Sequence, residues 1–265
     1  MSALATALAG CRVEGRAALV GYLPAGFPDL DGSVALLRAM VAAGVDVVEV
    51  GLPYSDPVMD GPTIAAAAAR ALAGGTRSRD VLRVVELVAA AAPTVVMTYW
   101  NPVEQYGVAG FARDLAAAGA SGLVTPDLVP DEAAEWLGAA DEHGLDKVFL
   151  VAPSSTPQRL KMTAAASRGF VYATAVMGVT GAREQTSAAA PALVARVRAV
   201  TDLPVGVGLG VSTAAQAAEV AGYADAVIVG SAFVRTVERA GEPARALQAV
   251  GELAADLARG VRRTG

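Results

Sequence analysis

Glu49 and Asp60 are the two residues whose type and setting best suit acid–base chemistry. Glu49 stands in the apolar run 45–51, whose β-branched residues are typical of a buried strand. Side chains alternate faces along a strand, so Glu49 shares a face with Val47. A carboxyl group buried among apolar residues has its charged form desolvated, which raises its pKa toward neutrality and suits it to move protons. The alternative is a structural Glu49 that pairs with a neighbouring base.

Asp56 and Asp60 lie in the Pro-rich segment 51–62 that follows this run. Both stand in turn-forming sequences, because an Asp side chain accepts hydrogen bonds from nearby backbone amides. A turn role is the favoured interpretation for Asp56. Asp60 stands eleven residues beyond Glu49. It either forms such a turn or folds back over the end of the strand, and the pattern leaves both open.

Three Gly-containing segments, 177–183, 206–212 and 229–232, follow apolar runs late in the chain. Backbone N–H groups of Gly-rich turns, and of the first turn of a following helix, bind phosphate. The candidate residues are Gly181, Gly210, Gly230 and Ser231. The alternative is that the glycines only allow close packing, but three such loops together favour a phosphate site. With two lysines in the whole chain, amides and hydroxyls must bind most of this phosphate.

The other reactive side chains are few. His143 is the only histidine, which argues against a His-rich metal site or a His-containing triad, and we expect it to cap a helix or lie at the surface. Lys147 opens a strand and Lys161 falls in a helix, so neither is placed for a Schiff base. Cys11 is the only cysteine; it cannot form an intrachain disulfide and is expected to be a buried apolar residue. These residues therefore argue against a His-rich metal site, a His-containing triad and lysine-imine chemistry.

The composition argues against several classes of partner. The chain has 21 basic and 26 acidic residues, a net charge of −5, and lacks the basic cluster that nucleic-acid binding needs. Its longest uncharged run, 87–103, is interrupted by Pro93 and does not resemble a membrane span. Residues 1–10 lack the positive charge that opens a secretory signal and predict a short N-terminal helix. We expect a cytoplasmic protein with neither nucleic acid nor membrane as a partner.

Eight apolar runs, rich in β-branched residues, predict parallel strands buried on both faces. They are 18–22, 45–51, 94–99, 122–125, 147–152, 170–175, 203–207 and 226–230. Helical patterns lie between them. The first has an apolar stripe at Leu30, Val34, Leu37 and Val41. Residues 130–132 resemble a helix start, and 186–200 carries another stripe.

This alternation over 265 residues predicts one (β/α)8 TIM barrel with a short N-terminal helix, residues 1–265 forming a single domain. A doubly wound open sheet is the alternative. In a barrel, chemistry lies on the loops that follow the strands. Asp60 and the three Gly-containing segments fall on such loops.

The segment 48–62, with the sequence VEVGLPYSDPVMDGP, is highly specific and resembles the α subunit family of tryptophan synthase. The resemblance covers nearly the whole chain in order. It continues through 21–28, 97–102, 124–128, 152–157, 178–182 and 208–212. Family members commonly have Thr at the position of Pro24 and often Ser at that of Ala175.

The resemblance implies retro-aldol cleavage of indole-3-glycerol phosphate to indole and glyceraldehyde 3-phosphate, with Glu49 and Asp60 as the catalytic acids. This implied chemistry fits the residues without metal or cofactor. It also implies which residues bind the substrate: Tyr22 and Tyr99 at the indole pocket, Tyr172 at the end of the sixth strand, Thr180 near Asp60, and Gly181, Gly210, Gly230 and Ser231 at the phosphate. The implied partner is the pyridoxal-phosphate β subunit, in an α2β2 complex that takes up the indole for L-tryptophan synthesis.

Two other functions remain open from the residues. A sugar-phosphate epimerase or isomerase would share the phosphate loops, but it would not explain two acids near the second strand beside an aromatic mouth without lysines. A subunit that only activates another protein would not need Glu49 and Asp60.

Overall fold

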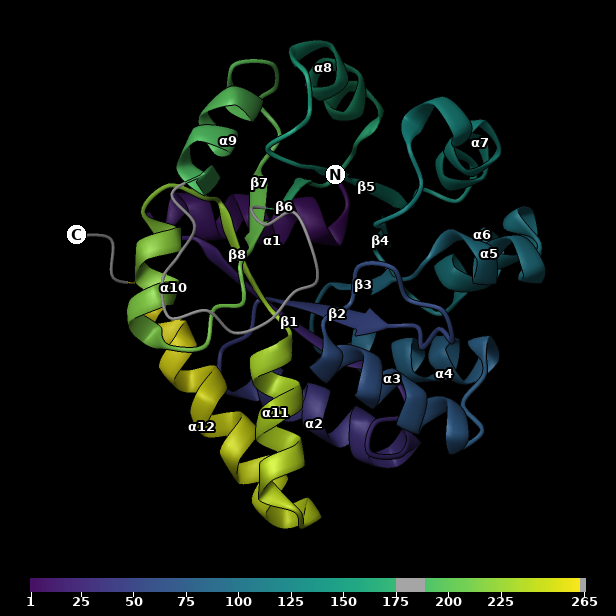
Figure 1. Cartoon of the computed structure of the whole chain (residues 1–265), viewed down its shortest axis with the longest axis vertical. Helices are drawn as coiled ribbons and strands as arrows, with labels where there is room; N and C mark the ends of the chain where they lie inside the picture. Colours follow the sequence, from purple (N-terminus) through teal and green to yellow (C-terminus); the bar gives the residue numbers. More distant parts are fainter. Residues whose placement is uncertain (175–188, 263–265) are drawn as a thin grey trace.

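The computed structural model describes residues 1–174 and 189–262, and its strands close into a parallel barrel in sequence order (Figure 1). The strands are β1 (Ala18–Pro24), β2 (Val47–Gly51), β3 (Thr94–Met97), β4 (Gly122–Thr125), β5 (Asp146–Val151), β6 (Val171–Thr174), β7 (Val205–Gly208) and β8 (Ala226–Val229). Pairing of β1 with both β2 and β8 completes the circle. The predicted TIM barrel is confirmed, and the open sheet is excluded.

Helices surround the strands, and in Figure 1 most of them form a ring while α1 lies across the barrel. They are α1 (Ala3–Val13), α2 (Leu30–Ala42), α3 (Pro62–Ala73), α4 (Ser78–Ala89), α5 (Trp100–Tyr106), α6 (Val108–Ala117), the 3-10 turn η1 (Pro130–Glu132), α7 (Ala134–Glu142), α8 (Pro157–Ala166), α9 (Ala189–Arg198), α10 (Ala214–Ala221), α11 (Ser231–Ala240) and α12 (Pro243–Val261). Within the described ranges, every helix is too short or too polar to cross a bilayer.

The apolar core has two layers, one on each face of the barrel wall. The inner layer fills the barrel and includes Val20, Val47 and Val95. The outer layer, between strands and helices, includes Val48 and Val50. Because side chains alternate along β2, the position of Val47 places Glu49 on the inner face.

Several predicted boundaries were wrong by a few residues, for local reasons. Strand β2 starts at Val47 because Val45 N–H donates to Met40 O in the turn that ends α2. Strand β3 ends at Met97, before the start of α5. The segment 130–132 forms only the single turn η1, and α7 begins at Ala134. On α2, Leu30 is 37% exposed, so the buried face is shifted from the predicted stripe toward Leu36 and Met40.

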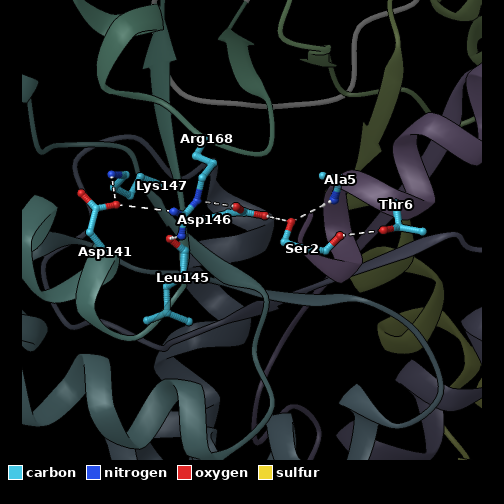
Figure 2. A network of polar contacts seen from close by, with 8 residues as sticks. All are labelled: Ser2, Ala5, Thr6, Asp141, Leu145, Asp146, Lys147 and Arg168. Atoms are coloured by element: carbon cyan, nitrogen blue, oxygen red, sulfur yellow. Dashed lines mark hydrogen bonds and ion pairs between the residues drawn. The ribbon is translucent and has the colours of Figure 1, made fainter.

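Helix α1 closes the N-terminal end of the barrel, and Figure 2 shows the polar contacts that join its N-cap, Ser2, to Asp146. Its Leu4, Leu8 and Cys11 belong to the inner apolar layer. Ser2 Oγ donates to the buried carboxylate of Asp146 at the start of β5, and Arg168 Nε donates to the same carboxylate at 2.9 Å. Since α1 fills this end, the opposite end is left for a substrate.

Candidate active site

Glu49 lies inside the barrel. On the neighbouring strands its register partners are Tyr22 of β1 and Val95 of β3. It is 1% exposed, and its Oε2 has no hydrogen-bond partner among the described residues. Burial raises the pKa of Glu49 from 4.5 to about 8. None of the ion pairs in the described part of the chain involves Glu49, so the alternative of a structural pair with a base finds no support there.

Asp60 folds back toward the end of β3, which decides between the two possibilities that its sequence left open. Tyr99 Oη donates to Asp60 Oδ1 at 3.1 Å, and the N–H groups of Met59 and Asp60 donate to Tyr99 Oη at 3.0 and 3.1 Å. Burial raises the pKa of Asp60, and the Tyr99 hydrogen bond opposes that rise. By contrast, Asp56 is exposed, and its carboxylate accepts a hydrogen bond from the hydroxyl of Ser55.

Tyr22 and Tyr172 surround the Glu49 end of the barrel, and both are at least nine-tenths buried. Burial raises the pKa of each well above its ordinary value, and the negative charge of Glu49 adds to both shifts. Each hydroxyl packs against a glycine backbone. A Cβ at Gly51 would lie 2.3 Å from Tyr22 Oη, and one at Gly208 would lie 2.5 Å from Tyr172 Oη. These close approaches explain why glycines follow the acid and stand in β7.

The candidate phosphate residues lie on neighbouring strand exits. Strands β7 and β8 are paired, with Gly208 opposite Ile228. Gly210 follows β7, while Gly230 is the N-cap of α11 and Ser231 its first residue. The first N–H groups of a helix have no intrahelical acceptor and attract anions, so this arrangement suits a phosphate. Thr180 and Gly181 lie outside the described residues.

The sequence reasoning missed two contributors to this end of the barrel. The ring of Tyr54 packs on that of Tyr99, with centroids 5.4 Å apart. Both carboxylate oxygens of Asp127, which follows β4, accept from Trp100 N–H at 2.9 and 3.1 Å. Asp127 stands in a Pro-Asp sequence typical of turns, so the sequence could flag it as a capping residue but could not name the helix that it caps.

The other reactive side chains lie where the sequence placed them. Lys147 opens β5 and pairs with Asp141 at 2.6 Å, and Lys161 is in α8. His143 is the C-cap of α7. Cys11 is buried against the barrel interior, which raises its pKa to about 11 and keeps it protonated. None of the four reaches the end of the barrel that holds Glu49 and Asp60.

Comparisons with known proteins agree with this geometry. Residues 8–262 match the family model for the tryptophan synthase alpha chain. The chain is 66% identical to the tryptophan synthase alpha chain of Acidothermus cellulolyticus, over 99% of this chain and 98% of that one, and 65% identical to that of Salinispora arenicola over the same shares. Its fold superposes on a structure of Mycobacterium tuberculosis tryptophan synthase with a TM-score of 0.93 and 59% identity, covering 98% of both chains. The chain therefore belongs to the tryptophan synthase alpha chain family and has that family's function, the lyase reaction on indole-3-glycerol phosphate in tryptophan biosynthesis.

Proposed function

We propose that Glu49 is the single acid and base of this reaction and that Asp60 stabilises the charge that develops on indole. The observation that carries the proposal is the Glu49 carboxyl group, 1% exposed inside the barrel with a pKa of about 8. At neutral pH such a group is mostly protonated, so it starts the cycle as an acid. General acid–base catalysis of this kind contributes about 10²–10⁴ in rate.

The proton steps balance around Glu49. Its carboxyl group gives its proton to indole C3, which leaves a positive charge on the indole nitrogen. The carboxylate then removes the proton from the glycerol hydroxyl on the carbon attached to C3. The bond between that carbon and C3 breaks, its electron pair returns to the indole ring, and the aldehyde forms. Glu49 ends protonated, ready for the next turnover.

Asp60 supplies the negative charge that this intermediate needs. Its carboxylate faces the indole N–H in the proposed complex and is worth most when that nitrogen becomes positive, because a charge fixed in a partly buried site is weakly screened. Tyr22, Tyr99 and Tyr172 line the indole pocket. Gly210, Gly230 and Ser231 bind the phosphate, and Thr180 and Gly181 belong to the proposed substrate-binding residues.

We further propose that the chain acts as one barrel domain, residues 1–265, in the cytoplasm. Its partner is a tryptophan synthase β subunit, which takes up the indole in an α2β2 complex. Titrating the chain with that β subunit is expected to raise indole production about tenfold or more, which needs about 1.4 kcal/mol at the transition state. Full activity of the isolated chain would contradict the coupling.

The Glu49→Gln variant tests the role of Glu49. The amide keeps the shape of the side chain and loses the proton, so indole release should fall at least about 10²-fold while binding of a non-reacting indole–phosphate analogue is largely kept. Asp56→Asn is the control: it changes an exposed residue in the loop that follows β2 and should leave turnover unchanged. Near-normal turnover of Glu49→Gln would show that another group moves the protons.

A further inference from the structure

Tyr99 Oη lies at the centre of a hydrogen-bond cluster around Asp60. It accepts from the N–H groups of Met59 and Asp60 and donates to Asp60 Oδ1, at 3.0 to 3.1 Å. A phenol has one proton to donate and two lone pairs, and all three are used on the same two residues. One oxygen atom thus fixes both the backbone and the carboxylate of Asp60.

The position of Tyr99 is in turn tied to Asp127. Tyr99 is the N-cap of α5, and both carboxylate oxygens of Asp127 accept from Trp100, the first residue of that helix, at 2.9 and 3.1 Å. This N–H has no intrahelical acceptor, and an acid at a helix N-terminus is also favoured by the helix dipole. Asp127, Tyr99 and Asp60 follow β4, β3 and β2, so hydrogen bonds link the exits of three neighbouring strands.

An apolar pocket wall alone would not use the Tyr99 hydroxyl. The ring is 5% exposed and packs against Tyr54, and phenylalanine would provide the same surface for an indole. The hydroxyl instead makes every hydrogen bond available to it with the segment that carries Asp60. Its geometry is therefore that of a support for a charged group.

We propose that Tyr99 is a positioning residue, which holds the Asp60 carboxylate in place for the transition state, and that Asp127 supports it by capping α5. The inference rests on the proposed role of Asp60. A carboxylate that moves away from the indole nitrogen loses the charge stabilisation but not the indole or phosphate contacts. The defect should therefore appear in kcat rather than in KM.

Tyr99→Phe is the direct test, in the full chain together with its β subunit. We expect kcat to fall about tenfold or more, with KM and glycerol 3-phosphate binding changed less than about twofold. The acid limb of kcat/KM should also move to higher pH, because the lost hydrogen bond had favoured ionised Asp60. Tyr22 also feels the charge of Asp60, but burial raises its pKa well above the ordinary value, so it stays neutral over the acid limb.

Tyr106→Phe is the matched control. Tyr106 lies on the same helix α5 and also donates to a carboxylate, that of Asp114, at 2.7 Å. Loss of the Tyr106 hydroxyl should leave kcat and the acid limb of kcat/KM unchanged. The thermal midpoints of Tyr99→Phe and Tyr106→Phe should be similar. A Tyr99→Phe enzyme with an unshifted acid limb and normal kcat overturns the positioning role. If Asp60→Asn is also fully active, the proposed role of Asp60 itself fails.

Asp127→Ala tests the second half of the linkage. If Asp127 acts through Tyr99, its loss should lower kcat by less than Tyr99→Phe, and the double variant should be no slower than Tyr99→Phe alone, since coupled residues are not additive. Multiplied defects in the double variant would show that Asp127 acts independently. An unfolded Asp127→Ala would show in the thermal midpoint, and Asp127→Asn, which retains one acceptor oxygen, then replaces it in the cycle.

Discussion

Glu49 and Tyr22 are register partners on β2 and β1, and their side chains enter the same barrel interior. Their proximity has an electrostatic consequence: burial and the nearby charges of Asp60 and Glu49 raise the pKa of Tyr22 well above its ordinary value. The phenol therefore stays neutral and adds no negative charge beside Glu49. Burial also keeps Glu49 mostly protonated at neutral pH, as its proposed role as the initial acid requires.

The pH dependence of kcat/KM should reflect this state. With a pKa of about 8, Glu49 loses its proton as the pH rises through that value, so kcat/KM should fall on the alkaline side with a midpoint near pH 8. The acid side should fall where Asp60 becomes protonated, at a pH above the ordinary pKa of an aspartate. Steady-state kinetics from pH 5 to about pH 10 measures both limbs. Full activity at pH 10 would contradict the assignment of Glu49 as the initial acid.

The same burial predicts a pH-dependent stability. Folded Glu49 binds its proton up to about pH 8, whereas in the unfolded chain it releases it near pH 4.5. The unfolded state is therefore favoured progressively as the pH rises from 4.5 to 8, and the loss is complete above 8. Glu49→Gln removes this titrating group. The thermal midpoint of the variant should therefore rise relative to that of the unaltered chain as the pH increases from 5 to 8. A constant difference over that range would mean that Glu49 is ionised in the folded protein.

Ser231→Ala should weaken binding of the phosphate. Loss of one hydrogen bond to a charged oxygen costs about 1.5–3 kcal/mol, or about tenfold or more in affinity. Calorimetric titration should show weaker binding of glycerol 3-phosphate and of the substrate, while the binding of indole alone should be unchanged. Ser167→Ala, whose hydroxyl donates to Thr163 O on α8, should change neither. Equal weakening of indole would place Ser231 elsewhere in the site.

The N-terminal end of the barrel should affect stability without affecting catalysis. Ser2 caps α1 and donates a hydrogen bond to Asp146 (Figure 2). Ser2→Ala removes both contacts, so the free energy of unfolding should fall by about 1–2 kcal/mol and the thermal midpoint by a few degrees. Thr6→Ala, whose exposed hydroxyl donates to Ser2 O, is the matched control and should change little. A fall in kcat without a fall in stability would contradict the separation of the two ends.

The amino-acid sequence determined the strand order, the barrel and the burial of Glu49, the carboxyl group proposed to move protons. This was possible because these features rest on local patterns: continuous apolar runs mark strands buried on both faces, and a lone Glu49 in such a run must be desolvated. The same local evidence fixed His143, Lys147 and Cys11 outside the site. Boundaries such as the start of β2 depended on hydrogen bonds in turns, and the spacing of apolar residues does not reveal such bonds.

The tertiary structure alone decided how Asp60 is held. Its sequence fits a simple turn and a residue over the barrel mouth equally well. The choice depends on the Tyr99 hydroxyl, thirty-nine residues further along the chain, and on Asp127, a further twenty-eight residues on. Such contacts arise because the parallel pairing of β3 with both β2 and β4 brings the ends of the three strands side by side (Figure 1). Residues distant in sequence then meet at one edge, and that distance leaves no periodic signal along the chain.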